Sequence, residues 1–242
     1  GAFSVAMIGP GPALLLATDR LGREPLAWAR WGDTVVFGTR TDAVMAHPRA
    51  VKKLNPQSLY DYLFHHCMPA PSSILQGVQR LLPAQYVHIV EGSVETGHYW
   101  RLHYTDHATT PYADLALEFR QHLRAGVIRA AADERVGCFL SGGTDSSTVT
   151  GLLTEARGAP VDSFSIGFAA EGYDEIGYAR ITSEHFKTRP HEYYVTPADV
   201  TTAIPLIAAA YDEPFGNASA VPTYYCAKLA REHGIDTLLA GD

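Results

Sequence analysis

A short glycine-containing segment carries the residue types that most clearly favour chemistry. The apolar run 136–140 ends at this segment, and residues 148–153 read as the start of a buried helix. Between them lie hydroxyl side chains, two glycines and one carboxylate: Ser141, Gly142, Gly143, Asp145, Ser146 and Ser147. A strand that breaks into a glycine turn and restarts as a helix presents free backbone N–H groups and the positive helix end to one point. The segment is therefore predicted to bind phosphate.

This segment does not match the two commonest nucleotide-binding patterns. A Walker A loop needs a Lys directly before Ser or Thr, but Thr144 and Asp145 precede Ser146. The dinucleotide fingerprint needs three spaced glycines, which are absent. A loop that adds a carboxylate to amides and hydroxyls needs a cation between that carboxylate and the phosphate, and Mg²⁺ is the natural choice. Asp145 is the predicted ligand, and an ordinary strand–helix turn is the less favoured alternative.

Length and composition place the chain among ordinary globular proteins. Its 242 residues suffice for one large domain or two modest ones. The net charge is −7 and no Lys/Arg run is present, which argues against a nucleic-acid partner. No apolar stretch approaches the roughly 18–20 residues that span a bilayer. Three widely spaced cysteines without a CxxC pair fit reduced thiols, so a cytoplasmic location is expected and none is predicted to be a nucleophile.

The first hundred residues read as short strands and turns. Four apolar or β-branched runs, separated by GPGP, LGREP and WGD, are predicted strands: 2–8, 13–18, 26–29 and 34–37. Residues 41–46 and 56–66 are predicted helices, the second with Asn55 as its N-cap. Residues 85–90 and 94–100 form a predicted hairpin. Together they predict an antiparallel β architecture with peripheral helices.

Strands and helices alternate beyond the polar stretch 103–110. The predicted strands are 136–140, 161–166, 192–195 and 237–239, and the predicted helices are 111–131, 145–156, 174–186, 198–210 and 222–232. Such alternation favours a parallel sheet with helices on both faces. Ligands of such sheets bind beyond the carboxyl ends of the strands, where segments 141–147, 167–173 and 240–242 are all expected. These three segments can therefore converge on one ligand.

The sequence SGGTDSS at 141–147 resembles the SGGxDS pyrophosphate loop, or PP-loop, of enzymes that cleave ATP to AMP and pyrophosphate. Among these the chain is most similar to the asparagine synthetase family of class II glutamine amidotransferases. Four more stretches agree with that family in order and spacing: ATDRLGREPL (17–26), SFSIGF (163–168), YDEPFGNASAVPTYYCAKLAREHG (211–234) and LLAGD (238–242). The loop alone would also fit GMP synthetase, NAD synthetase or argininosuccinate synthetase. The stretch 17–26 distinguishes the asparagine synthetase family from these three, because it resembles the amidotransferase half that only this family has fused upstream of the loop.

The resemblance implies a role for each matching residue. Five residues would cradle the pyrophosphate end of ATP: Ser141, Gly142, Gly143, Ser146 and Ser147. Leu140 and Ile166 match positions that wall the adenine and ribose, although plain core residues at strand ends are an equal alternative. Gly241 would allow close approach to the nucleotide. Asp145, which would hold Mg²⁺, and Asp242, which would lie near the reacting phosphate, are the implied catalytic residues.

The chain departs from the family pattern at three places. Ala240 replaces a frequent Ser, which removes one hydroxyl contact. Thr18 replaces the usual Arg in a segment that is mostly a structural turn in the family. Asp212 and Glu213 open a stretch that looks closer to a broader bacterial branch than to dedicated asparagine synthetases. A solvated acidic pair before a proline turn is the alternative for these two carboxylates.

The fold that the resemblance implies has two parts. Residues 107–242 would be a truncated α/β ATP-pyrophosphatase domain, adenine nucleotide hydrolase-like, with a parallel sheet. Residues 1–106 would be the second half of an antiparallel Ntn-type α+β amidotransferase domain. The chain opens without Met in an apparent interior strand and stops directly after an apolar run, so a segment of a longer protein is expected. The family's N-terminal Cys nucleophile and glutamine-binding positions would lie upstream, and no glutaminase residue is assigned.

The implied function is that of an ATP-dependent, amide-forming ligase, with asparagine synthase (glutamine-hydrolysing) as the favoured reaction. Aspartate or a related carboxylate would form an acyl-adenylate, which ammonia from glutamine would then amidate after passing through a tunnel between the domains. ATP, the acid and glutamine are the implied small-molecule partners, Mg²⁺ the implied cofactor, and a homodimer is compatible with the family. Two alternatives stay open: a β-lactam-forming or peptide-cyclising relative that uses an internal amine, and a nucleotide-binding module without catalysis.

Overall fold

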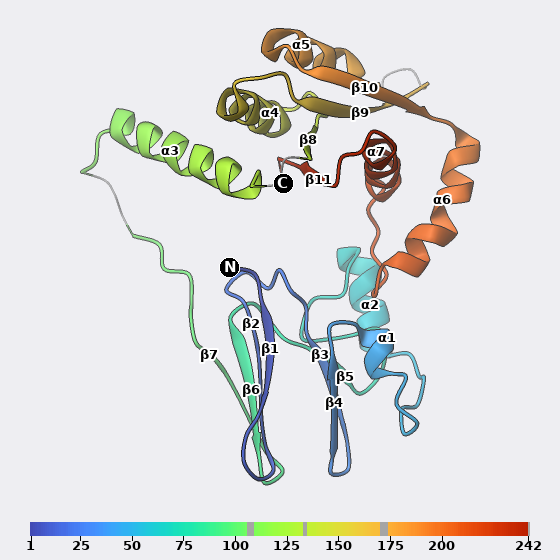
Figure 1. The fold of residues 1–242 in the computed structure, drawn as a ribbon. Coiled ribbons are helices and arrows are strands. Elements are labelled where there is room, and N and C mark those ends of the chain that lie inside the picture. The colour runs from blue at the N-terminus through green and yellow to red at the C-terminus, as the bar shows by residue number, and fades with distance from the viewer. Residues whose placement is uncertain (106–108, 133–134, 170–173, 242) are drawn as a thin grey trace. The chain divides into compact units, whose positions relative to one another are not determined.

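The computed structural model describes residues 1–105, 109–132, 135–169 and 174–241. The chain packs into two units (Figure 1). The first unit contains Gly1–Thr105 and Ala208–Asn217, and the second contains Asp106–Ile207 and Ala218–Asp242. Residues 208–217 thus pack with a part of the chain that precedes them by more than a hundred positions, although residues on both sides of them belong to the second unit.

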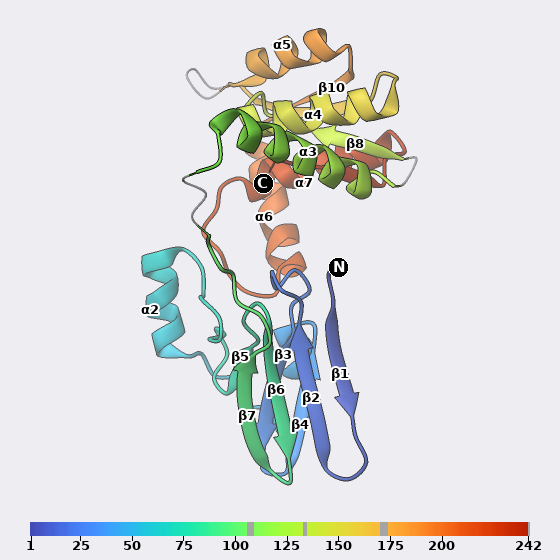
Figure 2. The ribbon, with the colours of Figure 1, turned by 90° about the vertical axis from the view of Figure 1, so that its left-hand side faces the viewer.

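The first unit is built on two antiparallel sheets (Figure 2). One has the order β1-β2-β6-β7, with the strands β1 (Ser4–Ile8), β2 (Ala13–Thr18), β6 (Gln85–Val90) and β7 (Ser93–His98). The other has the order β4-β3-β5, with β3 (Ala27–Trp31), β4 (Thr34–Gly38) and β5 (Val78–Arg80). The predicted hairpin is confirmed: Glu91 and Gly92 connect β6 to β7 with φ values of 48° and 84°, the left-handed conformations of a tight hairpin turn.

Side chains that alternate along β3 build two cores of the first unit. Trp28 packs with Leu16 and Val87 of the opposing sheet. Its neighbours Ala27 and Ala29 point the other way and pack with α1 (Thr41–Val44) through Val44 and Met45. This division follows from the two-residue period of a strand. The sheet of β3 is therefore covered on both faces, by the other sheet and by α1.

The start of α2 (Pro56–His65) follows the sequence pattern closely. Asn55 is its N-cap, and the side-chain oxygen of Asn55 accepts hydrogen bonds from the N–H groups of Gln57 at 3.1 Å and Ser58 at 3.4 Å. These bonds satisfy N–H groups that the first helical turn leaves without partners. The predicted cap is therefore confirmed.

The turn after β2 is organised by one buried carboxylate. Asp19 is 3% exposed and accepts hydrogen bonds from the N–H groups of Leu21 at 3.0 Å and Glu24 at 3.1 Å. Burial by itself would raise the pKa of Asp19, but backbone hydrogen bonds from Glu24, Leu21, Arg23 and Phe3 outweigh it and hold the pKa at about 2. Asp19 is therefore ionised over the whole physiological pH range.

The second unit contains one four-stranded sheet in which all pairs are parallel. Its order is β10-β9-β8-β11, with β8 (Val136–Phe139), β9 (Asp162–Phe168), β10 (Arg189–Val195) and β11 (Thr237–Leu239). The helices are α3 (Tyr112–Ala130), α4 (Thr144–Arg157), α5 (Ile176–Phe186), α6 (Pro197–Ala210) and α7 (Ala220–Glu232). The predicted mixture of an antiparallel part and a parallel α/β part is thus confirmed.

The strand order places a switch point between β8 and β11. From β8 the chain moves outward in one direction to β9 and β10, and it then returns to the other side of β8 as β11. In open parallel sheets, ligands bind beyond the carboxyl ends of the strands at such a point. The predicted phosphate loop follows β8 and Gly241 follows β11, so both lie at this position in the fold.

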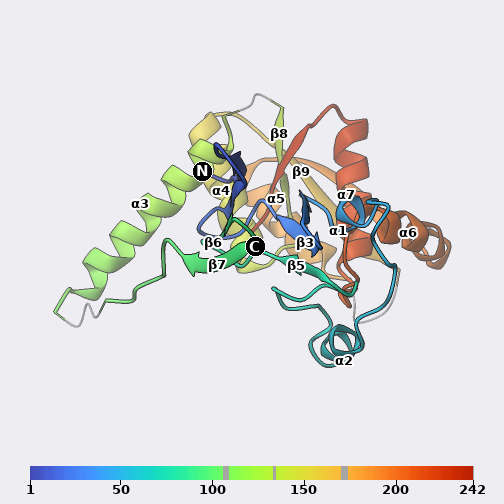
Figure 3. The same ribbon diagram turned by 90° about the horizontal axis from the view of Figure 1, so that it is seen from below.

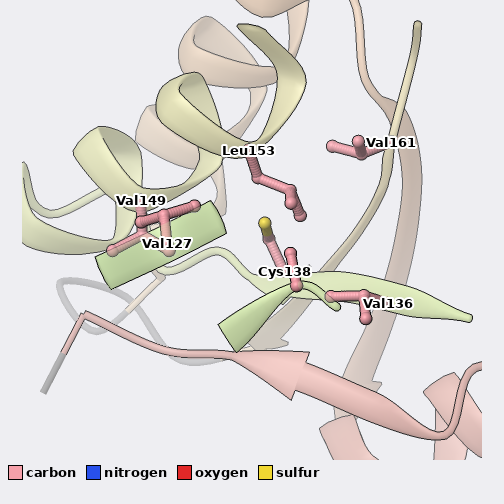
Figure 4. Close-up of a cluster of buried hydrophobic side chains, with 7 residues drawn as sticks. Val127, Val136, Cys138, Val149, Leu153 and Val161 are labelled. Atoms are coloured by element: carbon pink, nitrogen blue, oxygen red, sulfur yellow. The ribbon is translucent and has the colours of Figure 1, made fainter. Parts of the chain in front are cut away.

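Helices cover both faces of the parallel sheet. α4 and α5 pack on β8, β9 and β10, and α7 packs on β9 and β10 (Figures 1 and 3). Figure 4 shows the core under α4, where Leu153 and Val149 meet Cys138 of β8 and Val127 of α3. Within the described residues, no helix combines the length and the apolar character needed to cross a bilayer.

Candidate nucleotide-binding site

The loop between β8 and α4 leaves the first turn of α4 open. Gly143 is the N-cap of α4, with extended backbone (φ −70°, ψ 163°) and no side-chain cap hydrogen bond. The N–H groups of a first helical turn have no partner within the helix, and they carry the positive end of the helix dipole. A phosphate oxygen is the kind of acceptor that such a turn binds. The local conformation therefore has the character predicted for residues 141–147.

Gly142 adopts a conformation and a position that suit only glycine. Its φ is +85°, and a Cβ atom there would lie 2.5 Å from the backbone nitrogen of Ala179 and 2.6 Å from Cβ of Tyr178. Backbone atoms of α5 cannot yield in the way that the end of a flexible side chain can. Close packing of the loop on α5 therefore requires a residue without a side chain here.

Serine hydroxyls fix the shape of the loop. The Ser146 hydroxyl lies 2.9 Å from that of Ser141, accepts the N–H of Ser141 at 3.3 Å and donates to the carbonyl of Gly143 at 3.2 Å. The Ser147 hydroxyl lies 2.9 Å from that of Thr182 on α5. Ser146 therefore closes the turn internally, while Ser147 joins α4 to α5.

Gly241 brings the end of β11 against the first turn of α4. A Cβ atom on Gly241 would lie 2.5 Å from the backbone nitrogen of Ser146 and 2.8 Å from Cβ of Asp145. No other residue type would allow this approach without a shift of the backbone. The segments that follow β8 and β11 are thus adjacent, as the convergence of loop ends at the sheet edge predicted.

A cavity of about 420 Å³ opens beside the loop. Such a volume lies within the range of small-molecule sites. Six predicted site residues are on its wall: Ser141, Gly143, Asp145, Ser146, Ile166 and Gly241. The exposed carboxylate of Asp145 is part of that wall. The carboxyl ends of β8, β9 and β11 thus share one cavity.

The other predicted residues lie elsewhere or outside the described part. Gly142 and Ser147 are not on the cavity wall. Leu140 is 1% exposed, its N–H donates to the carbonyl of Phe164 at 2.8 Å, and its carbonyl accepts the Ser165 hydroxyl at 2.7 Å. Leu140 therefore occupies the core directly behind the loop. Asp242 and residues 170–173 are outside the described residues.

Several residues on the cavity wall were not predicted from the sequence. Phe139 is one of them, and four come from other elements: Glu175, Ser219, Pro222 and Thr223. Phe168 is also on the wall, within the segment 167–173 that was expected there. Ser219 and Thr223 are four positions apart at the start of α7, so one face of that helix carries both hydroxyls. That spacing is visible in the sequence. The packing of α7 against β9, which brings this face to the loop, is a tertiary contact that the local pattern does not contain.

The donor set of the cavity suits Mg²⁺. Asp145 and Glu175 both contribute to the wall. Mg²⁺ commonly uses one or two protein carboxylates and completes its shell with substrate phosphate oxygens and water. No cluster of three or more His, Cys, Asp or Glu side chains with metal-binding geometry occurs among the residues that the structure describes. The two carboxylates therefore fit a cation that shares its coordination shell with a phosphate.

Two of the three cysteines are buried and unreactive in character. Cys138 and Cys226 are fully buried. Burial raises the pKa of the Cys138 thiol to about 11 and that of Cys226 to about 12. A thiolate, the nucleophilic form, is therefore scarce at both positions at neutral pH. Cys138 packs in the core under α4 (Figure 4).

Comparison with known proteins identifies relatives along nearly the whole chain. The chain is 33% identical over 238 residues to a protein of Methanocaldococcus jannaschii that is provisionally named glutamine-hydrolysing asparagine synthetase 2, and it covers 45% of that protein. It is 25% identical over 228 residues to glutamine-hydrolysing asparagine synthetase 1 of Bacillus subtilis and covers 35% of it. These alignments take in 95% and 93% of this chain. The chain thus spans less than half the length of these curated relatives.

Among solved structures, the chain was compared with the NMN synthetase of Francisella tularensis. The two have a TM-score of 0.37 and 15% sequence identity over 50% of this chain and 52% of that one.

Two family profiles match adjoining parts of the sequence. The glutamine amidotransferase domain matches residues 1–100, and asparagine synthase matches residues 118–242. The second match takes in the loop, the switch point and the cavity wall described above. The chain belongs to the asparagine synthase family.

Proposed function

We propose that the full-length protein is an ATP-dependent, amide-forming ligase that uses glutamine as nitrogen donor, with aspartate as the acceptor acid. The cavity at the switch point, lined by the loop after β8 and by Gly241 after β11, is the single observation that carries this proposal. The names of the two relatives, glutamine-hydrolysing asparagine synthetases, support the choice of donor and acceptor. Residues 1–106 and 107–242 are the proposed amidotransferase and synthetase parts.

The proposed reaction has two steps. A carboxylate oxygen of aspartate attacks the α-phosphorus of ATP, so that the bond from this phosphorus to the bridging oxygen breaks and aspartyl-AMP and pyrophosphate form. Ammonia released from glutamine then attacks the acyl carbon, AMP leaves with the electron pair of its bond to that carbon, and the nitrogen loses a proton to give the amide. Both steps make or release phosphate groups, so a site that neutralises and holds them is the main requirement.

The loop residues supply that requirement in the proposed mechanism. The open first turn of α4 and the Ser141 hydroxyl would bind the pyrophosphate portion of ATP. Because Gly143 has no side chain, a phosphate oxygen can approach the backbone closely. Ile166 and Phe168 offer apolar surface for the adenine on the same wall. Asp145 would hold Mg²⁺, which when bound neutralises charge on the phosphates.

The test is release of AMP and pyrophosphate by the full-length protein with ATP, aspartate and glutamine. Asp145→Asn should lower AMP release by roughly 100-fold or more, because it removes a charge that acts on the reacting phosphates. Glu155→Gln is the matched control: it neutralises a carboxylate on the same helix that pairs with Arg124 on the surface. This control should keep wild-type turnover.

Three outcomes would contradict the proposal. Absence of AMP release with every carboxylic acid tried would exclude a ligase. Tight ATP binding without pyrophosphate–ATP exchange would favour a binding module. Wild-type turnover of Asp145→Asn would leave a ligase but remove the assigned role of the loop.

A further inference from the structure

Asp212 and Glu213 tie a segment of the synthase-matched sequence to the first unit. Residues 208–217 lie within the range that matches asparagine synthase, but they pack with residues 1–105. α6 ends in this segment at Ala210, and its carbonyl accepts a hydrogen bond from the Arg40 guanidinium at 3.0 Å. The two carboxylates, called the acidic anchor below, accept hydrogen bonds from Thr41, Asp42 and Ile74.

Asp212 acts as a cap for α1 from 170 positions away in the sequence. Arg40, the local N-cap residue, makes no side-chain cap hydrogen bond. The two carboxylate oxygens of Asp212 instead accept the N–H of Thr41 at 2.6 Å and the N–H of Asp42 at 3.1 Å. Each oxygen therefore has a separate backbone donor of the first unit.

Glu213 is bound in the same way by a second loop. Its side chain is 10% exposed. One carboxylate oxygen accepts the Thr41 hydroxyl at 3.1 Å, and the other accepts the N–H of Ile74 at 2.9 Å. The guanidinium of Arg80 lies 4.0 Å from the first oxygen. Glu213 is thus a nearly buried, fully engaged carboxylate, and the alternative of a solvated acidic pair is excluded for it.

The anchored segment leads directly to the nucleotide cavity. The N–H of Gly216 donates to the carbonyl of His66 at 2.7 Å, which fixes the end of the segment on the first unit. Ser219, the first residue of this stretch on the cavity wall, follows Gly216 by three positions, and Pro222 and Thr223 are on the wall as well. A displacement of the anchored segment must therefore either move Ser219 or be taken up by the two residues between Gly216 and Ser219.

We propose that Asp212 and Glu213 are positioning residues that couple nitrogen supply by the first unit to amide formation at the cavity. This inference rests on the proposed function. Suppose that nucleotide binding favours one arrangement of Ser219, Pro222 and Thr223. The anchor then shifts α1 and the loop that contains Ile74 towards the arrangement that goes with it. Conversely, a change in α1 or in that loop alters the affinity of the cavity for the nucleotide by the same factor. The coupling is required when ammonia comes from glutamine and is dispensable when ammonia is supplied in solution.

The test compares two nitrogen donors in the full-length protein. Asp212→Asn and Glu213→Gln keep size, but each replaces one accepting oxygen with an NH₂ group that faces an N–H or O–H donor. AMP release supported by glutamine should fall roughly tenfold, whereas release supported by ammonium chloride should stay within about twofold of wild type. Glutamate should then form in excess of AMP. The matched control is Asp61→Asn, which removes a carboxylate of the first unit that accepts a hydrogen bond from Gln57 within its own helix.

A milder variant guards against loss of folding. Gly216→Ala keeps both carboxylates but places a Cβ atom 3.1 Å from Cβ of His66, so it disturbs the same segment and should give the same split between donors. Thermal unfolding of each variant is followed alongside. Equal losses with both donors, or unchanged glutamine use in every anchor variant, would overturn the coupling alone. Absence of AMP release by the wild type with either donor would overturn the proposed function and the coupling with it.

Discussion

Asp19 illustrates how one side chain can organise a turn without any role at the cavity. Its carboxylate is buried and accepts hydrogen bonds from the backbone N–H groups of Leu21 and Glu24 within the LGREP turn and of Phe3. Since these bonds favour the charged form, the folded protein holds the pKa near 2, below the ordinary aspartate value of 3.8. A lowered pKa contributes stability that is present above the ordinary value and is lost as the pH falls through the lowered one.

Asp19→Asn should therefore destabilise the protein in a pH-dependent way. The variant has no charge to lose, so the deficit in its free energy of unfolding should be full above roughly pH 4 and should shrink towards pH 2. Urea unfolding of both proteins at several pH values measures this difference. Asp33→Asn, at the exposed turn between β3 and β4, is the comparison. A deficit that does not change between these pH values would contradict the assignment.

Single residues differ in how far the sequence predicts them. The N-cap role of Asn55 is local, and it is confirmed. Thr18, which replaces the usual Arg, is 1% exposed and donates to the carbonyl of Leu82 at 2.9 Å, a partner 64 positions away. Glu213 likewise depends on partners that no local pattern reveals. Roles fixed by neighbours in sequence can be predicted, whereas roles fixed by distant partners cannot.

Among the elements, the loop between β8 and α4 combines an unusual backbone with very close packing. Gly142→Ala is expected to destabilise the loop in two ways. The positive φ costs roughly 1–2 kcal/mol for an L-residue with a side chain, and the new Cβ atom would clash with the backbone of α5. Gly158 at the end of α4 also has a positive φ (63°), but nothing lies within 4 Å of its Cβ position. Comparison of Gly142→Ala with Gly158→Ala therefore separates the effect of a strained φ from the effect of the clash with α5.

We expect Gly142→Ala to lower the thermal midpoint more than Gly158→Ala and to weaken ATP binding by roughly tenfold or more, since a displaced loop loses bound phosphate contacts. Gly158→Ala should bind ATP as the wild type does. Calorimetric titration and thermal unfolding of the full-length protein measure the two effects. Equal behaviour of the two variants would show that close packing of Gly142 on α5 has no part in nucleotide binding.

Element types were predicted well because periodicity and punctuation are local. β2, β6 and β11 have the predicted bounds, and the seven predicted helices agree with α1 to α7 within two residues at each end. The strand β5 was missed because its three residues are too short to show alternation, and β5 is a strand only through its pairing with β3. The end of β9 at Phe168, two residues beyond the prediction, is likewise set by pairing with β10.

At the scale of the whole molecule, contacts distant in sequence decide where residues 208–217 belong. The acidic anchor should protect amides of the first unit against hydrogen exchange. In Glu213→Gln the amide of Ile74 should exchange roughly tenfold faster, and in Asp212→Asn those of Thr41 and Asp42 should do so, because each loses a charged acceptor. Mass spectrometry of exchanged fragments measures these rates. The amide of Ser58, capped by Asn55, is the internal control, and unchanged rates at all three amides would contradict the anchor.

The same contacts bear on how the polypeptide emerges during translation. Thr41, Asp42 and Ile74 are synthesised long before their acceptors, Asp212 and Glu213. Until those acceptors leave the ribosome, the N–H groups of Thr41, Asp42 and Ile74 are hydrogen-bonded to water. The loops of the nascent amidotransferase portion that carry them therefore lack their final contacts. Vectorial synthesis, which usually lets an N-terminal domain mature first, would here delay that domain until Asp212 and Glu213 have been made.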